Sequence, residues 1–193
     1  MQIGITKHFF TVAFLFLAGP LMAQLPGAKP PTDDPAVVVR KYCQLDLDGV
    51  GLDGSNPRWR EFNSLVIGEE EWPDTPIVLV SGFRVATVRK DERKAIVKVS
   101  YNRVGRLEGD AESDELVAES RLEMFEFHLL KTSTGWKIPM QDLPPHVSVQ
   151  ALRTHIVKLL NQDAQNGDVS RKAVLGRLIS RLDSLPQRNS RWQ

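Results

Sequence analysis

The stretch from Lys94 to Val104 alternates polar and apolar side chains with a period of two residues. Successive side chains of a β-strand point to opposite faces, so this period predicts a strand with one buried and one wet face. The β-branched run at 76–88 precedes it, and the polar residues 90–93 lie between the two. A long antiparallel hairpin is therefore predicted in the middle of the chain.

Two further strands are predicted after this hairpin. The first covers about 117–131, and the second covers 136–139 after a turn at 132–135 that ends in Gly135. Consecutive hairpin connections favour an antiparallel sheet of about four strands, with one face packed and the other in water.

Helical periodicity precedes the sheet. Asp34-Pro35 is a helix start, because Asp caps free N–H groups and Pro is tolerated in the first turn. The first helix is expected to reach about Val50. Asn56-Pro57 repeats the signal for a shorter helix with four apolar residues on one side, Trp59, Phe62, Leu65 and Val66.

Helical periodicity returns after the sheet, following Pro144-Pro145. Ser148 is a candidate cap for one helix, and a turn at 166–168 leads into a second, each with an apolar stripe. These stripes must be buried, either on the chain's own sheet or against a partner, including a second copy in a homodimer. Residues 186–193 are expected to form a flexible tail.

The N-terminal residues predict export. A basic residue precedes an apolar run of about ten residues, and Gly19-Pro20 and Ala23 follow. This run is too short to span a bilayer, so 1–23 is interpreted as a signal peptide, with an uncleaved anchor as the alternative. The Pro-rich segment 24–34 is interpreted as a linker. We therefore expect a periplasmic or extracellular protein with no stable membrane span.

Charge and cysteine content narrow the function classes. The chain has 25 Lys and Arg against 24 Asp and Glu, which gives no electrostatic reason to expect a nucleic-acid partner. Its one cysteine, Cys43, excludes an intramolecular disulfide, and is interpreted as a buried thiol, with a reactive thiol or an intermolecular bridge as alternatives. The histidines lack metal-ligand spacing, so neither a metal nor another cofactor is predicted.

The order of these elements resembles the nuclear transport factor 2-like superfamily, the cystatin-like α+β cone. The resemblance rests on the capped helix from Pro35, the hairpin at 77–104, and the last hairpin, where Phe125–Lys131 leads to Gly135-Trp136-Lys137-Ile138. It implies an α+β domain at 35–145, with N-terminal helices packed on a bent antiparallel sheet. The C-terminal helical pair at 146–185 is then an extension of that domain.

Members of that superfamily include binding or assembly modules as well as cavity enzymes, so the resemblance leaves function open. We expect a non-catalytic module that binds a small apolar ligand or a protein partner. The alternative is a metal-independent lyase or isomerase that uses Glu126 and His128 with Tyr101 in one cavity, where Glu126 and His128 exchange a proton. These two residues are two apart on one strand and share a face, which is either a cavity wall or an exposed surface.

A second candidate pair lies on the neighbouring strand. Tyr101 and Arg103 also share a face, and the planar guanidinium of an arginine can orient a ligand carboxylate. The alternative is a Tyr at the edge of the core beside a solvated Arg.

Overall fold

The computed structural model describes residues 33–68, 76–108, 115–139, 144–166 and 169–185, which all belong to one compact unit, 31–193. Helix α1 (Pro35–Leu47) begins as expected, because the Asp34 carboxylate accepts a hydrogen bond of 2.9 Å from the backbone N–H of Ala36. Gly49 has a left-handed φ of 71°, which ends α1 and leads into the 3-10 helix η1 (Val50–Leu52).

The second predicted helix is shorter than expected. Helix α2 (Trp59–Asn63) has five residues, and Val66 lies instead in the short strand β1 (Val66–Ile67). The backbone N–H of Ile138 donates to the carbonyl of Leu65 at 2.9 Å. Because Val66 and Ile67 pair with residues 138–139, they adopt an extended conformation and not a helical one. This tertiary effect cannot be predicted from local periodicity.

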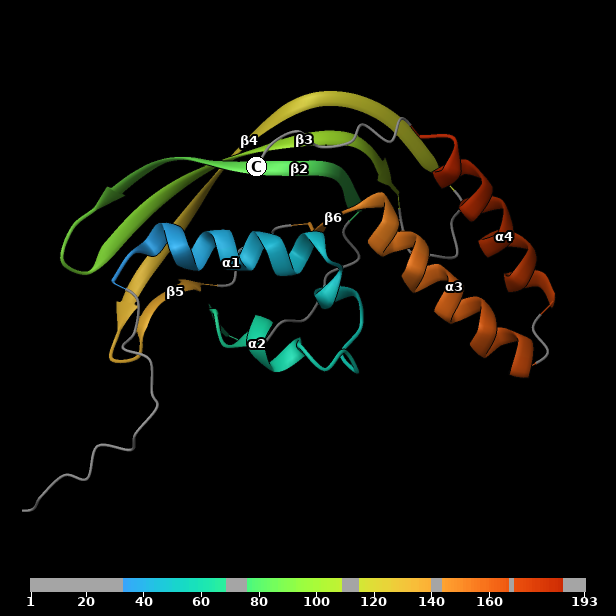
Figure 1. Cartoon of the computed structure of the whole chain (residues 1–193), viewed down its shortest axis with the longest axis horizontal. Coiled ribbons are helices and arrows are strands. Elements are labelled where there is room, and N and C mark those ends of the chain that lie inside the picture. Colours follow the sequence, from blue (N-terminus) through green and yellow to red (C-terminus); the bar gives the residue numbers. More distant parts are fainter. Residues whose placement is uncertain (1–32, 69–75, 109–114, 140–143, 167–168, 186–193) are drawn as a thin grey trace, which may run out of the picture. The chain divides into compact units, whose positions relative to one another are not determined.

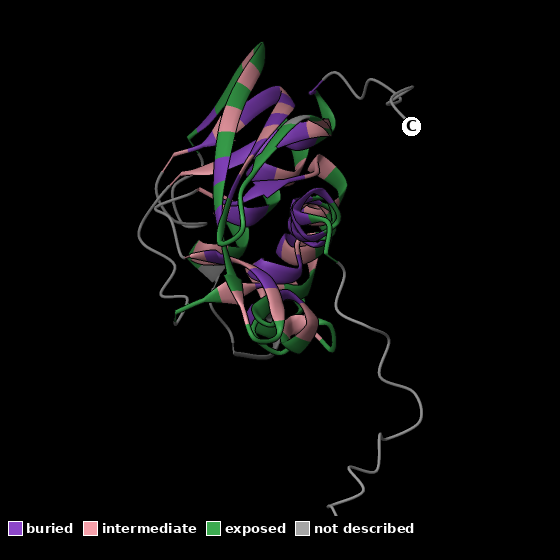
Figure 2. Ribbon diagram, turned by 90° about the vertical axis from the view of Figure 1, so that its left-hand side faces the viewer, coloured by how far each residue is buried: buried purple, intermediate pink, exposed green. Residues whose placement is uncertain are grey.

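The α+β class is confirmed, and the strands run in one sheet with the order β1-β5-β4-β3-β2-β6 (Figure 1). Four antiparallel strands form its centre: β2 (Ile77–Lys90), β3 (Lys94–Leu107), β4 (Leu116–Thr132) and β5 (Gly135–Pro139). Buried and exposed bands alternate along the strands (Figure 2).

The expected number of about four strands is too low. The described residues form six, because β1 pairs in parallel with β5 and β6 (His146–Val147) pairs in parallel with β2. Each added strand has two residues, which is too short to show a periodic pattern in the sequence.

One face of the sheet packs against α1 and α2, and we call it the inner face. Its core on β3 consists of the odd-numbered positions from Ala95 to Tyr101, which pack with Val39, Tyr42 and Phe62. The ring centroids of Tyr42 and Phe62 are 4.9 Å apart, and those of Tyr42 and Phe127 are 5.7 Å apart. Aromatic rings therefore occupy the space between α1 and the sheet.

The helices α3 (Val149–Asn166) and α4 (Val169–Asp183) contact each other and pack near one end of the opposite face. Their stripes, including Leu152, Ile156 and Leu178, are fully buried in a second apolar cluster with Leu79 and Leu107 of the sheet. The Ser148 hydroxyl caps α3 by accepting from the N–H of Ala151 at 3.0 Å. The apolar stripes are thus buried within the chain itself.

Some sequence-based predictions concern residues outside the ranges that the structure describes. The predicted signal peptide at 1–23, most of the predicted linker at 24–34 and the predicted tail at 186–193 lie outside the described residues. Within the described ranges, no helix is both long and apolar enough to cross a membrane.

Candidate functional site

A cluster of polar side chains lies inside the core, between α1, β3 and β6. Cys43 and Asp46 are three residues apart on α1 and so share a face. The Cys43 thiol is 3.1 Å from the Tyr101 hydroxyl, and the Tyr101 ring stacks on His146 with centroids 4.2 Å apart. An Asp46 carboxylate oxygen accepts a hydrogen bond of 2.9 Å from the backbone N–H of His146. The cluster therefore connects three elements of the fold.

Burial keeps three of these groups uncharged at neutral pH. It raises the pKa of Cys43 to about 12 and that of Tyr101 well above 10.0, so both hydroxyl and thiol keep their protons. Desolvation also lowers the pKa of His146 to about 4, so its imidazole is neutral. None of these pKa values lies near 7, where a general acid or base works best, and a thiol with this pKa is a poor nucleophile.

Arg103 lies on the same face as Tyr101, as expected, but its guanidinium is occupied. It is 5% exposed and lies 3.2 Å from a carboxylate oxygen of Glu119 and 3.5 Å from one of Glu123. Arg121 contacts the same two carboxylates. Two positive and two negative side chains thus balance, and a ligand carboxylate would have to displace an existing ion pair. The contacts favour a structural role for Arg103 over the ligand-orienting one.

Glu126 and His128 lie on the other face of the sheet, away from Tyr101. In the β3–β4 register Glu126 is opposite Lys98 and His128 is opposite Ile96, whereas Tyr101 is opposite Glu123. Both candidate residues are exposed, and the Glu126 carboxylate is 2.7 Å from the Lys98 ammonium group, which lowers its pKa. The expectation that this pair and Tyr101 line one cavity is therefore wrong. The physical reason is that Phe127 and Leu129 take the buried positions of the strand.

The face that carries Glu126 and His128 is open over the middle of the sheet, and we call this region of β2, β3 and β4 the outer face. Its side chains come from alternate positions of the three strands. They are Arg84, Arg89, Lys94, Ile96, Lys98, Ser100, Asn102, Leu122, Met124, Glu126, His128 and Leu130. Two of them are large apolar groups with more than half of their surface in solvent: Leu122 is 64% exposed and Met124 is 56% exposed.

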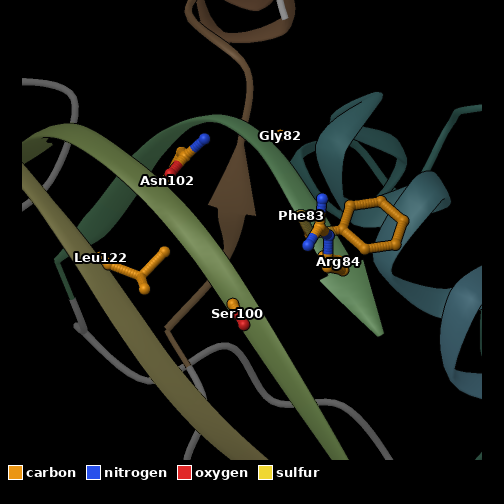
Figure 3. Close-up of a pocket in the computed structure, with 6 residues that line it drawn as sticks. All are labelled: Gly82, Phe83, Arg84, Ser100, Asn102 and Leu122. Atoms are coloured by element: carbon orange, nitrogen blue, oxygen red, sulfur yellow. The ribbon is translucent and has the colours of Figure 1, made fainter. Parts of the chain in front are cut away.

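A pocket of about 280 Å³ lies beside Leu122, lined by residues from three adjacent strands (Figure 3). Strand β2 contributes Gly82–Arg84, β3 contributes Ser100 and Asn102, and β4 contributes Leu122. The Phe83 ring is turned toward the core, where its centroid is 6.2 Å from that of Tyr101. The pocket therefore combines an apolar side chain with an amide, a hydroxyl and a guanidinium, the mixture that small ligands and peptide side chains require.

The β2–β3 register explains why a pocket forms at this place. The register shifts between Val80 and Phe83, so two residues of β2, Ser81 and Gly82, lie opposite the single residue Asn102 of β3, and β2 bulges by one extra residue. One of them is Gly82, which has no side chain to fill the space. A bulge next to a residue without a side chain bends the strand and leaves a hollow.

Sequence reasoning missed both the internal cluster and the pocket. Asp46 gave a signal, because it is an acidic residue on the apolar side of the first predicted helix. Leu122 and Met124 gave a second signal. They are large apolar residues at alternate positions that share the face of Glu126, and alternation predicts that this face is exposed to water. The bulge in β2 gave no signal in the sequence, because it depends on how β2 pairs with β3.

Among the residues that the structure describes, no group of three or more His, Cys, Asp or Glu side chains is arranged to hold a metal ion. Comparisons of the chain with protein-family models, with curated proteins and with solved structures find no match. Its function must therefore be inferred from the geometry of these two regions.

Proposed function

We propose that this chain is an exported, non-catalytic binding module of the nuclear transport factor 2-like type, and that it binds its partner on the outer face. The observation that carries the proposal is the exposure of Leu122 and Met124 beside a pocket with hydrogen-bonding walls. Exposed apolar side chains next to a hollow are typical of surfaces that are covered in a complex.

The internal cluster supports the non-catalytic part of the proposal. Its side chains contact one another, and their pKa values are displaced away from neutrality. The space between α1 and the sheet, which holds the reacting groups in cavity enzymes of that superfamily, is packed with aromatic rings here. A lyase or isomerase that uses Glu126 and His128 is not proposed, because both side chains lie in solvent.

The pocket fits one branched aliphatic side chain and the backbone next to it. Leu122 offers the apolar contact, while the Asn102 amide and the Ser100 hydroxyl can bond to a peptide group. We therefore infer that the ligand is a peptide segment with an exposed leucine-like side chain.

This inference is tested with a fluorescein-labelled peptide of sequence Leu-Ser-Leu-Ser, whose binding is measured by fluorescence anisotropy. The Leu122→Lys variant should weaken binding about tenfold, because it removes the apolar contact. The matched control is Val117→Lys on the same strand, since Val117 is also exposed but does not line the pocket. Equal affinity of the wild-type protein and both variants would refute the proposed binding site.

A further inference from the structure

A second hollow lies on the outer face, toward the tip of the β2–β3 hairpin, with a volume of about 480 Å³. Four of the residues that line it are basic or can become so, namely Arg89, Lys90, Lys94 and His128. The lining also includes one acidic residue, Asp91, whose carboxylate accepts hydrogen bonds from the backbone N–H groups of Arg93 and Lys94. Ile96 and Leu130 lie between the basic residues. The register places Arg89, Ile96 and His128 in one row across three strands, so the two nitrogen-bearing groups flank an apolar one.

The outer face as a whole is basic, although the chain is balanced. It carries Arg84, Arg89, Lys94 and Lys98 against one carboxylate, that of Glu126. Over the whole chain, 25 basic residues stand against 24 acidic ones. The Lys98 ammonium group, and to a smaller extent His128 and Arg89, lowers the pKa of Glu126, because all of them lie on the same face as its carboxylate. A ligand that covers this face must supply negative charge.

We propose that the partner of the outer face is an acidic protein segment with leucine-like anchors, a proposal that rests on the binding function proposed above. The anchors occupy the pocket beside Leu122, and the acidic side chains lie over Arg89, Lys94 and His128. Asn102 and Ile96, which mark the two hollows, are six residues apart on β3, a distance of about 20 Å along the strand. An extended segment of about seven residues therefore reaches from one hollow to the other.

The Glu126–Lys98 ion pair lies between the two hollows and sets the order of groups on the partner. A partner carboxylate placed over Glu126 would be repelled, so the acidic residues belong at the hairpin end of the segment and the apolar residues at the other end. Anionic lipid and nucleic acid fit less well. The side chains of the outer face include no aromatic ring, whereas membrane interfaces and single-stranded nucleic acids are commonly bound through aromatic residues.

The test uses two labelled peptides that differ only in charge, Leu-Ser-Leu-Ser-Gly-Ser-Glu-Ser-Asp and the same sequence with Gln and Asn in place of Glu and Asp. The wild-type protein should bind the acidic peptide about tenfold more tightly than the neutral one at low salt. The double variant Arg89→Gln/Lys94→Gln should lose this preference. The matched control Arg60→Gln/Lys172→Gln removes the same charge from exposed positions on α2 and α4 and should keep it.

Three results would overturn the proposal. The first is equal affinity for both peptides; if Leu122→Lys still weakened both, the binding site would stand and only the acidic partner would fail. The second is an equal loss of preference in the two double variants, which would mean that only net charge matters. The third is binding to phosphatidylglycerol vesicles that depends on Arg89 and Lys94 while the acidic peptide does not bind, which would identify a membrane surface instead.

If the neutral peptide also failed to bind and Leu122→Lys had no effect, the binding function itself would be wrong.

Discussion

Protonation of His146 should destabilise the folded chain in mild acid. The side chain is 3% exposed and stacks on Tyr101, and desolvation lowers its pKa from 6.5 to about 4, against an opposing hydrogen bond to the backbone of Pro144. The folded pKa lies below the unfolded one, so as the pH falls the unfolded chain takes up the proton first. The stability that neutral His146 contributes is therefore complete above about pH 6.5 and is lost as the pH falls toward 4.

The size of the effect follows from the two pKa values. Between about pH 7.5 and about pH 4.5, the difference in proton binding amounts to roughly 2–3 kcal/mol of unfolding free energy. This is a large fraction of the stability of an ordinary domain. Carboxylates titrate in the same range, so the contribution of His146 must be measured as a difference between variants.

The assay is urea unfolding at both pH values for the wild-type protein and for His146→Phe. Phenylalanine keeps a ring against Tyr101 but has no proton to take up, so this variant should lose about 2–3 kcal/mol less than the wild type on acidification. If the two proteins lost the same amount of stability, His146 would not be the desolvated group that the structure shows.

Three other substitutions or reactions probe the core. Cys43 should not react with a thiol reagent at about pH 8 in the folded protein and should react fully in urea, because burial holds its pKa near 12; fast labelling without denaturant would contradict this. Phe127→Ala should cost about 3–5 kcal/mol in urea unfolding, since the ring is 1% exposed and packs on Tyr42, and a loss below about 1 kcal/mol would mean that the core is not packed as described. Asp46→Ala should cost about 1–3 kcal/mol in the same assay, because it leaves the buried N–H of His146 without its acceptor. Asp46→Asn retains an acceptor and should cost less. A larger loss of stability in Asp46→Asn than in Asp46→Ala would contradict this hydrogen bond.

The elements with long periodic patterns could be predicted from the sequence. The alternation at 94–104 and the cap at Asp34-Pro35 arise from local chemistry, and the structure has a strand and a helix at these positions. The short strands β1 and β6 could not be predicted, because two residues carry no period and their pairing joins segments far apart in the chain. The shortening of the second helix has the same cause.

The candidate site could be predicted only in part. Alternation correctly put Glu126 and His128 on one face and Tyr101 and Arg103 on one face, but it could not say which face of each strand is buried. The register decides this, since it places Phe127 beside Val97 in the core and turns Glu126 toward Lys98 in solvent. The pocket beside Leu122 depends on a bulge in the pairing of β2 with β3, which no local pattern reveals.

We propose that this protein binds its partner on the open face of its sheet and not in its interior. The most direct test is to map the backbone amide signals that shift when the Leu-Ser-Leu-Ser peptide is added to the isotopically labelled protein. We expect shifts at 82–84, 100–102 and 122–124, around the pocket on the outer face. Shifts concentrated at Cys43, Asp46 and His146, with none at Leu122, would contradict it, because they would show that the ligand enters the core.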